Sequence, residues 1–268
     1  MPPLDLSLGL GTSGLDDPAE CTDAVKRALE AGYRHVDTAQ MYDNESAVGD
    51  GIAAADVDRE EVIVATKIHP DNLAPDDVRE TARESLDRLG LDRVDLLYVH
   101  WPTSAYDAEA TLPAFDELVD DGVTDHVGVS NFTPELVREA TEILDAPIAA
   151  HQVECHPRLP QKELLDLAGE LDLDHDLVAY SPLGRGNLLD HPVVEEAAEA
   201  AGEHPAVTLL AWSLDRGVVP IPKSSGDHVE ANIRARSVDL PPEATAALDG
   251  LADDPKRYID PDEAAWNQ

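Results

Sequence analysis

Short apolar runs alternate with amphipathic stretches along most of the 268-residue chain. Several of the runs are continuous and rich in β-branched residues, as expected for strands buried on both faces. We predict eight strands: Leu6–Leu10, Arg34–Asp37, Val62–Thr66, Val94–Val99, His126–Val129, Ile148–Val153, Leu177–Tyr180 and Val218–Ile221.

The amphipathic stretches between these runs carry helix start and stop signals. Asp17-Pro18 begins one helix, and Gly32 ends it. A second helix stops at Gly90, and a third opens at Thr133-Pro134. The apolar positions that recur at helical spacing are Ala24, Val25, Ala28, Leu29, Val78, Ala82, Leu86, Leu89, Leu136, Val137, Ala140, Leu144, Leu164, Leu165, Ala168, Leu209, Leu210 and Leu214.

Alternation of strands and helices predicts a parallel sheet, because parallel neighbours need a crossover connection. Eight rounds of the pattern predict a closed (β/α)8 TIM barrel of the α/β class. We find no linker or change in composition, so residues 1–268 are predicted to form a single domain. In such barrels, functional groups gather at the carboxyl ends of the strands.

One glycine motif favours a different fold. Residues 9–14 read Gly-Leu-Gly-Thr-Ser-Gly, and Asp37 follows Gly14 by 23 residues, which fits a Rossmann dinucleotide fingerprint. In that fold, however, the third glycine lies in the helix that receives the pyrophosphate. Here the helix cannot begin before Asp17, and Asp16 and Asp17 would repel a phosphate. We therefore predict a turn at the mouth of the first barrel strand.

The charge balance is extreme. The chain has 56 acidic and 19 basic residues and a net charge of -37, so it repels itself in dilute buffer. Because molar salt shortens the screening length to about 3 Å, we infer adaptation to a molar-salt, halophilic cytoplasm. A merely acidic mesophilic protein is the alternative. Nucleic acid and anionic membranes share the sign of this charge and are excluded as partners. We expect a monomer.

Lysine and cysteine are both scarce in this chain. Only five lysines are present, so each is more strongly implicated in a role: Lys26, Lys67, Lys162, Lys223 and Lys256. The two cysteines, Cys21 and Cys155, are expected to be free thiols in a reducing cytoplasm, with a disulfide as the alternative. No apolar run approaches the roughly 20 residues that span a bilayer, and the first residues do not resemble a signal peptide.

Four polar residues stand at or just after consecutive strand ends. Asp37 ends the second strand and Tyr42 lies in the loop that follows it. Lys67 and His100 follow the third and fourth strands. We predict that all four converge at one end of the barrel.

This set suits the reduction of a carbonyl group, which requires a hydride and a proton. The hydride must come from a cofactor, and the proton can come from Tyr42. A free phenol has a pKa of about 10, which the ammonium of Lys67 is expected to lower. Asp37 would hold Lys67 charged, and His100 would orient the substrate oxygen.

Six ordered blocks between about residues 6 and 232 resemble the aldo-keto reductase superfamily. They are Gly32–Ala39 with Tyr42, Asn44 and Glu45; His100–Pro102; Gly128–Phe132; Gln152–Pro157; Tyr180–Leu183; and Ile221–Ser224. The short loops are similar to those of the prokaryotic branch that includes diketo-gluconate reductases. The resemblance implies an NADPH-dependent enzyme with Tyr42, Asp37, Lys67 and His100 as its catalytic residues.

The resemblance also implies a cofactor site. Ser130, Asn131 and Gln152 would bind the nicotinamide carboxamide, and Tyr180 would stack on the ring. Ser181 and Leu183 would meet the pyrophosphate. The adenosine end would be bound by Lys223, Ser224, His228 and Asn232. Relatives that prefer NADPH usually carry an arginine where this chain has His228, so NADH is the alternative cofactor.

Several residues also suggest other kinds of site. His151, Cys155 and His156 lack a second pair to complete a tetrahedral set, so no metal is predicted. Ser181 lacks the G-x-S-x-G context of a hydrolase nucleophile. Trp101, next to His100, is expected to line the substrate pocket. Trp266 fits a pocket-closing tail and a frayed terminus equally well.

The sequence is therefore compatible with three functions. The first is an oxidoreductase that reduces small aldehydes or ketones to alcohols. The second is a cofactor-binding regulatory subunit on the same barrel, and the third is a Schiff-base aldolase that uses Lys67.

Overall fold

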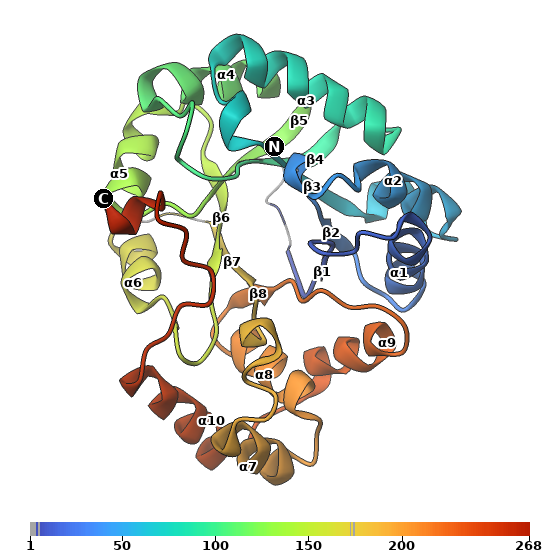
Figure 1. The fold of residues 1–268 in the computed structure, drawn as a ribbon, viewed down its shortest axis with the longest axis vertical. Coiled ribbons are helices and arrows are strands. Elements are labelled where there is room, and N and C mark those ends of the chain that lie inside the picture. Colours follow the sequence, from blue (N-terminus) through green and yellow to red (C-terminus); the bar gives the residue numbers. More distant parts are fainter. Residues whose placement is uncertain (1–3, 5, 172, 174) are drawn as a thin grey trace.

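Eight parallel strands lie side by side in chain order in the computed structural model, which describes residues 4, 6–171, 173 and 175–268. The sheet curls upon itself with its helices outside (Figure 1), so the predicted α/β barrel architecture is confirmed. The strands are β1 (Leu10–Gly11), β2 (His35–Asp37), β3 (Ile63–Ile68), β4 (Val94–Val99), β5 (Thr124–Ser130), β6 (Ile148–Glu154), β7 (Asp176–Tyr180) and β8 (Val218–Pro220).

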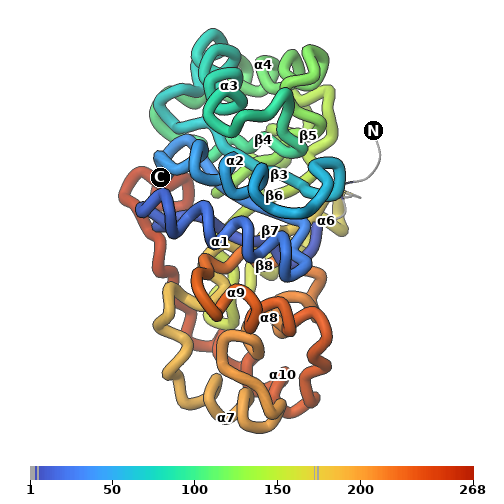
Figure 2. The backbone as a smooth tube through the Cα atoms, turned by 90° about the vertical axis from the view of Figure 1, so that its right-hand side faces the viewer, coloured from blue at the N-terminus to red at the C-terminus, as the bar shows by residue number. Residues whose placement is uncertain are grey.

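Ten α-helices occur in the described part of the chain, and Figure 2 shows several of them from the side. Asp17 caps the first helix by accepting the N–H groups of Ala19 and Glu20. Gly90, with a φ of 67°, ends the third. The helices are α1 (Pro18–Glu30), α2 (Glu45–Ala54), α3 (Pro75–Leu89), α4 (Ala108–Asp120), α5 (Pro134–Ile143), α6 (Lys162–Glu170), α7 (Pro192–Ala201), α8 (Pro205–Leu214), α9 (His228–Asn232) and α10 (Pro242–Asp249).

The barrel has a seam between β8 and β1. Gly9 N donates to Pro220 O at 3.0 Å, and Gly11 N donates to Pro222 O at 3.1 Å. Pro222 has no N–H with which to return a bond to Gly9, because its ring nitrogen lacks a hydrogen. The seam therefore carries one isolated bridge, Gly11 to Lys223, and the predicted closed ladder is open here among the described residues.

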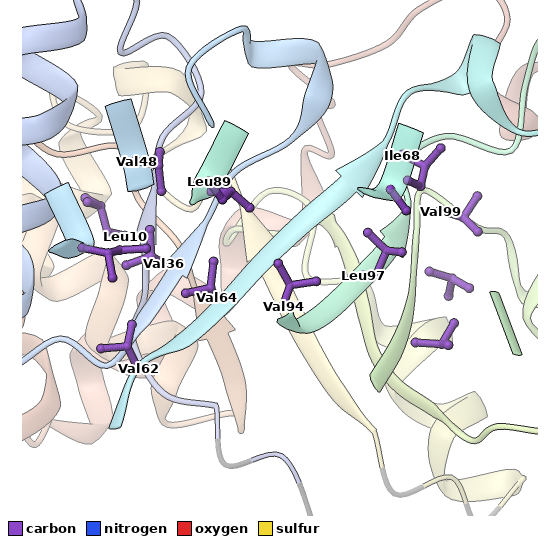
Figure 3. Close-up of a cluster of buried hydrophobic side chains, with 14 of the residues drawn as sticks. Leu10, Val36, Val48, Val62, Val64, Ile68, Leu89, Val94, Leu97 and Val99 are labelled. Carbon is purple, nitrogen blue, oxygen red and sulfur yellow. The ribbon is translucent and has the colours of Figure 1, made fainter. Parts of the chain in front are cut away.

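The predicted first strand is too long. Residues 10 and 11 pair with β2, whereas Leu6 is buried inside the barrel with the cluster Ala65, Leu96, Tyr98, Ala150, Val178, Val219 and Ile221. Leu6 thus helps to fill the barrel interior and does not extend the sheet. A larger apolar cluster lies between the sheet and the surrounding helices, and Figure 3 shows its β1–β4 part with Val48 of α2 and Leu89 of α3.

The glycine motif is not a Rossmann loop. Helix α1 begins at Pro18, as predicted. Gly14 has a φ of 76° and makes the turn, but Gly11 lies in β1. A Cβ atom on Gly11 would come within 2.5 Å of Ile221 O, so this glycine is needed for the close approach of β1 to the chain that follows β8.

Two further expectations concern the state of the cysteines and the lack of a membrane-spanning segment. Both cysteines are buried free thiols, and burial raises the pKa of Cys21 to about 11 and that of Cys155 to about 12. Among the helices of the described residues, none combines the length and apolar character needed to cross a bilayer.

Candidate active site

The carboxyl ends of β2, β3 and β4 bring three predicted residues together. Asp37 is the last residue of β2, Lys67 lies one residue before the end of β3, and His100 directly follows β4. Only 1%, 0% and 5% of their respective surfaces are exposed. Tyr42 comes from the 3-10 helix η1 (Gln40–Tyr42) that follows β2. The predicted convergence is present.

Lys67 is the centre of this cluster. Its Nζ donates to Asp37 Oδ1 at 2.5 Å, to Thr38 O at 2.8 Å and to Tyr42 Oη at 3.5 Å. Gln152 Nε2 donates to the second carboxylate oxygen of Asp37 at 2.7 Å. Both oxygens of the buried carboxylate therefore have partners, which is what a buried ion pair requires to be tolerated.

Burial and the neighbouring charges together set the pKa values of Lys67 and Tyr42. Burial alone would lower the pKa of Lys67, but the charge of Asp37 and the hydrogen bonds to Asp37 and Tyr42 outweigh it, so the net pKa is raised. Burial raises the pKa of Tyr42, and Lys67 only partly offsets this effect. Lys67 acts in the expected direction, but desolvation of the buried phenolate outweighs it, so the net pKa of Tyr42 is raised above its ordinary value.

His100 is a neutral imidazole in this site. Burial first, and then the positive charge of Lys67, hold the pKa of His100 well below 6.5. Its ring lies 5.7 Å from the ring of Tyr42 in an edge-on arrangement. A neutral imidazole can donate a hydrogen bond but holds no extra proton to give away at neutral pH. Of these two residues, His100 is therefore the weaker candidate for a proton donor.

A second set of polar side chains is locked beside the first. Asn131 Nδ2 donates to His100 O at 2.9 Å and to Ser130 Oγ at 3.0 Å. Tyr180 Oη donates to Asn131 Oδ1 at 2.8 Å. Ser130, Asn131 and Gln152 are nearly fully buried. The structure therefore brings together the residues expected to meet a nicotinamide, although Gln152 contacts Asp37.

The residues expected at the adenosine end are less tightly held. Asn232 Nδ2 donates to Ser224 Oγ at 2.8 Å, and both residues are buried. Lys223 and His228 are exposed. Between the two sets lies the loop after β7, where Ser181 has a φ of 49° and Leu183 is half-buried.

The rim of the site is aromatic. Trp101 lies 6.5 Å from His100, and Trp266 lies 5.7 Å from Trp101, measured between ring centres. Packing of Trp266 against Trp101 favours the pocket-closing interpretation of the tail. An open depression of about 500 Å³ adjoins Tyr42 and is lined by Ser13, Gly14, Asp16, Met41, Tyr42 and Asp43.

One buried acid escaped the sequence interpretation. Glu154, the last residue of β6, is fully buried. Its carboxylate accepts the N–H groups of Tyr258 and Ile259 and lies 3.1 Å from His156 Nε2. The only sequence signal was an acid at a strand end. Within the described residues, no group of three or more His, Cys, Asp or Glu side chains is arranged to hold a metal ion.

Comparisons with known proteins show which family the chain resembles. The sequence profile of the Aldo/keto reductase family matches residues 6–253. A curated aldo-keto reductase of Mycolicibacterium vanbaalenii is 40% identical over 262 residues, covering 95% of this chain and 91% of the relative. Another from Mycobacterium avium is 40% identical over 258 residues, covering 95% and 88%.

Solved structures are similar over nearly the whole chain. A candidate 2,5-diketo-D-gluconic acid reductase B is 34% identical with a TM-score of 0.91, covering 97% of this chain and 92% of the other. An aldo-keto reductase of Bombyx mori in complex with NADP is 32% identical with a TM-score of 0.87, covering 95% and 91%.

Proposed function

The chain belongs to the Aldo/keto reductase family of oxidoreductases, and from this premise we propose that it reduces small aldehydes and ketones to alcohols with NADPH. Tyr42 is the general acid of this reaction. The observation that carries the proposal is the buried Asp37–Lys67 ion pair placed against the Tyr42 hydroxyl.

Each of the four residues has a separate role in the proposed reaction. Tyr42 keeps its proton at neutral pH because its pKa is raised, and it gives that proton to the carbonyl oxygen. The Lys67 ammonium, 3.5 Å away, then stabilises the phenolate that remains. Asp37 keeps Lys67 charged and in place. Neutral His100 donates a hydrogen bond that orients the carbonyl oxygen.

The polar residues beside Tyr42 fit a nicotinamide cofactor. The side chains of Ser130, Asn131 and Gln152 offer both donors and acceptors to a carboxamide, and the flat ring of Tyr180 stands next to them. When bound there, the nicotinamide supplies the hydride that no side chain can donate. Lys223 and Ser224 would hold the adenosine phosphate, with Ser181 and Leu183 at the pyrophosphate.

The choice of NADPH over NADH rests on Lys223. This exposed lysine stands next to the buried Ser224–Asn232 pair. His228 offers a weaker phosphate contact than a guanidinium fork would. The silkworm relative was solved with NADP, which supports the same preference.

Composition and similarity also bear on the environment, oligomeric state and family branch of the protein. The net charge of -37 supports a halophilic, monomeric protein that works in a molar-salt cytoplasm. Similarity to the candidate 2,5-diketo-D-gluconic acid reductase B over 97% of the chain supports placement in that prokaryotic branch. We propose that residues 1–268 act as a single domain, of which residues 1–3, 5, 172 and 174 lie outside the described structure.

The test is cofactor oxidation at 340 nm in molar KCl, with NADPH and then NADH, against a panel of small aldehydes and diketones. Carbonyl-dependent oxidation, faster with NADPH, is the expected result. Cofactor binding detected by fluorescence without any oxidation would instead indicate the cofactor-binding regulatory subunit. A result with neither binding nor oxidation by folded protein would overturn the proposal.

A further inference from the structure

Tyr42 stands on a short and weakly held element. The 3-10 helix η1 consists of Gln40–Tyr42, and no described side chain caps its start. Asp43, which ends it, has a φ of 53°, a left-handed conformation that is uncommon for residues other than glycine. The Tyr42 hydroxyl meets Lys67 Nζ at 3.5 Å, which is long for a hydrogen bond. The position of the proposed proton donor must therefore be fixed from outside η1.

The side chain of Gln40 forms four hydrogen bonds with other elements. Its Nε2 donates to Thr81 O at 3.0 Å and to Ser85 Oγ at 3.1 Å, both on α3. Its Oε1 accepts His69 N at 2.9 Å and Asn72 Nδ2 at 3.1 Å, in the segment after β3. These bonds use both N–H groups and both lone pairs of the amide. Because His69 N can only donate and Thr81 O can only accept, the amide can stand only one way round.

Gln40 thereby links the two parts of the chain that carry Tyr42 and Lys67. Tyr42 follows Gln40 by two residues, and His69 follows Lys67 by two residues. The bond from His69 N to Gln40 Oε1 joins these two segments directly, and the bonds to α3 hold the amide from a third side. A shift of this amide would therefore change the separation of the Tyr42 hydroxyl and the Lys67 ammonium.

Further hydrogen bonds extend the network to the chain that follows η1. Arg88 Nη2 donates to Ser85 Oγ at 3.0 Å, and Arg88 Nε donates to Glu45 Oε2 at 2.7 Å. Glu45, the first residue of α2, is buried, and its Oε1 accepts Thr66 Oγ1 at 2.6 Å. Thr66 lies in β3, next to the proposed catalytic lysine. The backbone on both sides of the proposed proton donor is thus tied to β3, by Gln40 before it and by Glu45 after it.

We propose that Gln40 is a positioning residue that holds the Tyr42 hydroxyl beside the Lys67 ammonium for proton transfer. This inference rests on the proposed function, in which Tyr42 is the general acid. The four bonds of the Gln40 amide go to residues outside the reaction centre, so Gln40 acts through Tyr42. Catalysis is sensitive to such support, because a misplacement of about 1 Å can lower a rate roughly a hundredfold.

The test is Gln40→Met, which nearly keeps the length of the side chain and removes all four hydrogen bonds. Reduction of a small aldehyde, NADPH binding by fluorescence quenching and thermal denaturation are measured in molar KCl. We expect kcat to fall roughly ten- to a hundredfold, with KM for the aldehyde and Kd for NADPH within about twofold of wild type, as for an interaction needed only in the transition state. The solvent deuterium isotope effect on kcat should rise, because proton transfer then limits turnover.

Gln40→Glu separates the two sets of bonds. Its carboxylate can still accept His69 N and Asn72 Nδ2, but it cannot donate to Thr81 O, so we expect a kcat between those of wild type and Gln40→Met. If thermal denaturation shows that Gln40→Met does not fold, Gln40→Glu decides the question. A kcat equal to that of wild type would then overturn the inference.

The matched control is Gln161→Met. Gln161 is half-buried, as Gln40 is, and its Nε2 donates to Glu154 O at 2.6 Å after β6. Loss of this bond should leave kcat and the isotope effect unchanged. Wild-type turnover by Gln40→Met would overturn the inference alone. An equal loss of kcat and NADPH affinity would also overturn it, since that would show general loosening of the site. Absence of turnover by wild-type protein would overturn the proposed function as well.

Discussion

The two ends of the proposed cofactor site are built differently. At the carboxyl ends of β2–β4, Asp37, Lys67 and His100 are buried, and the first two are joined by a short hydrogen bond. After β8, the buried pair Ser224–Asn232 is neutral, and the charged side chain there, Lys223, is exposed. The reaction end is thus fixed by the fold, whereas the phosphate end depends on exposed side chains.

The difference follows from dielectric environment and salt. A buried charge pair is little screened, whereas exposed charges interact weakly when the screening length is about 3 Å in molar salt. We therefore expect changes at the reaction end to have large effects on activity and stability. Changes at the phosphate end should shift only cofactor preference.

The largest combined effect on stability and activity is expected for Lys67→Met. The change leaves the Asp37 carboxylate buried and unpaired, which should destabilise the fold by about 3–5 kcal/mol. It also removes the ammonium beside Tyr42, so turnover should fall by at least roughly a hundredfold. Urea denaturation and the 340 nm assay measure the two effects.

A double variant separates the effect on stability from the effect on activity. Asp37→Leu combined with Lys67→Met removes both charges, and it should recover most of the stability but none of the activity. Lys26→Met changes a half-exposed lysine on α1 and should alter neither. A Lys67→Met protein as stable as wild type would contradict the buried-pair account.

A smaller effect is expected for His228→Arg. A guanidinium fork binds phosphate more strongly than a neutral imidazole does, so the NADPH-to-NADH ratio of kcat/KM should rise about three- to tenfold. Ala246→Arg adds the same charge on the exposed surface of α10 and serves as the control. An unchanged ratio would mean that the 2'-phosphate lies elsewhere.

The smallest effect is expected from pH. The pKa of His100 lies well below 6.5 and that of Tyr42 above 10, so neither group changes its proton count between pH 6.5 and 9. We expect kcat/KM for a neutral aldehyde to be level across this range. A limb with a midpoint near pH 7 would show that one of these groups titrates there.

The reaction end was predictable because each residue follows a recognisable strand. Lys67 and His100 come after continuous apolar runs, and parallel strands bring their carboxyl ends to one edge. Hydrophobic periodicity thus places these side chains without any knowledge of their contacts. Helix α1 was equally clear, since Asp17-Pro18 is a strong start signal.

What escaped prediction depends on long-range contacts. The open seam follows from Pro222, which cannot donate to the first strand some 200 residues away in sequence. The pKa of Tyr42 is raised because burial outweighs the nearby charge, and burial is not a local property. The bonds from Tyr258 N and Ile259 N to the Glu154 carboxylate join residues more than 100 positions apart in sequence, so no local pattern indicates them.

The most direct test of the account is Tyr42→Phe, with NADPH binding and turnover measured on the same sample in molar KCl. Fluorescence quenching gives the Kd for NADPH, and absorbance at 340 nm gives kcat. The account predicts an unchanged Kd and a kcat lowered by roughly a hundred- to ten-thousandfold, because only the proton donor is removed. Turnover close to that of wild-type protein would contradict it.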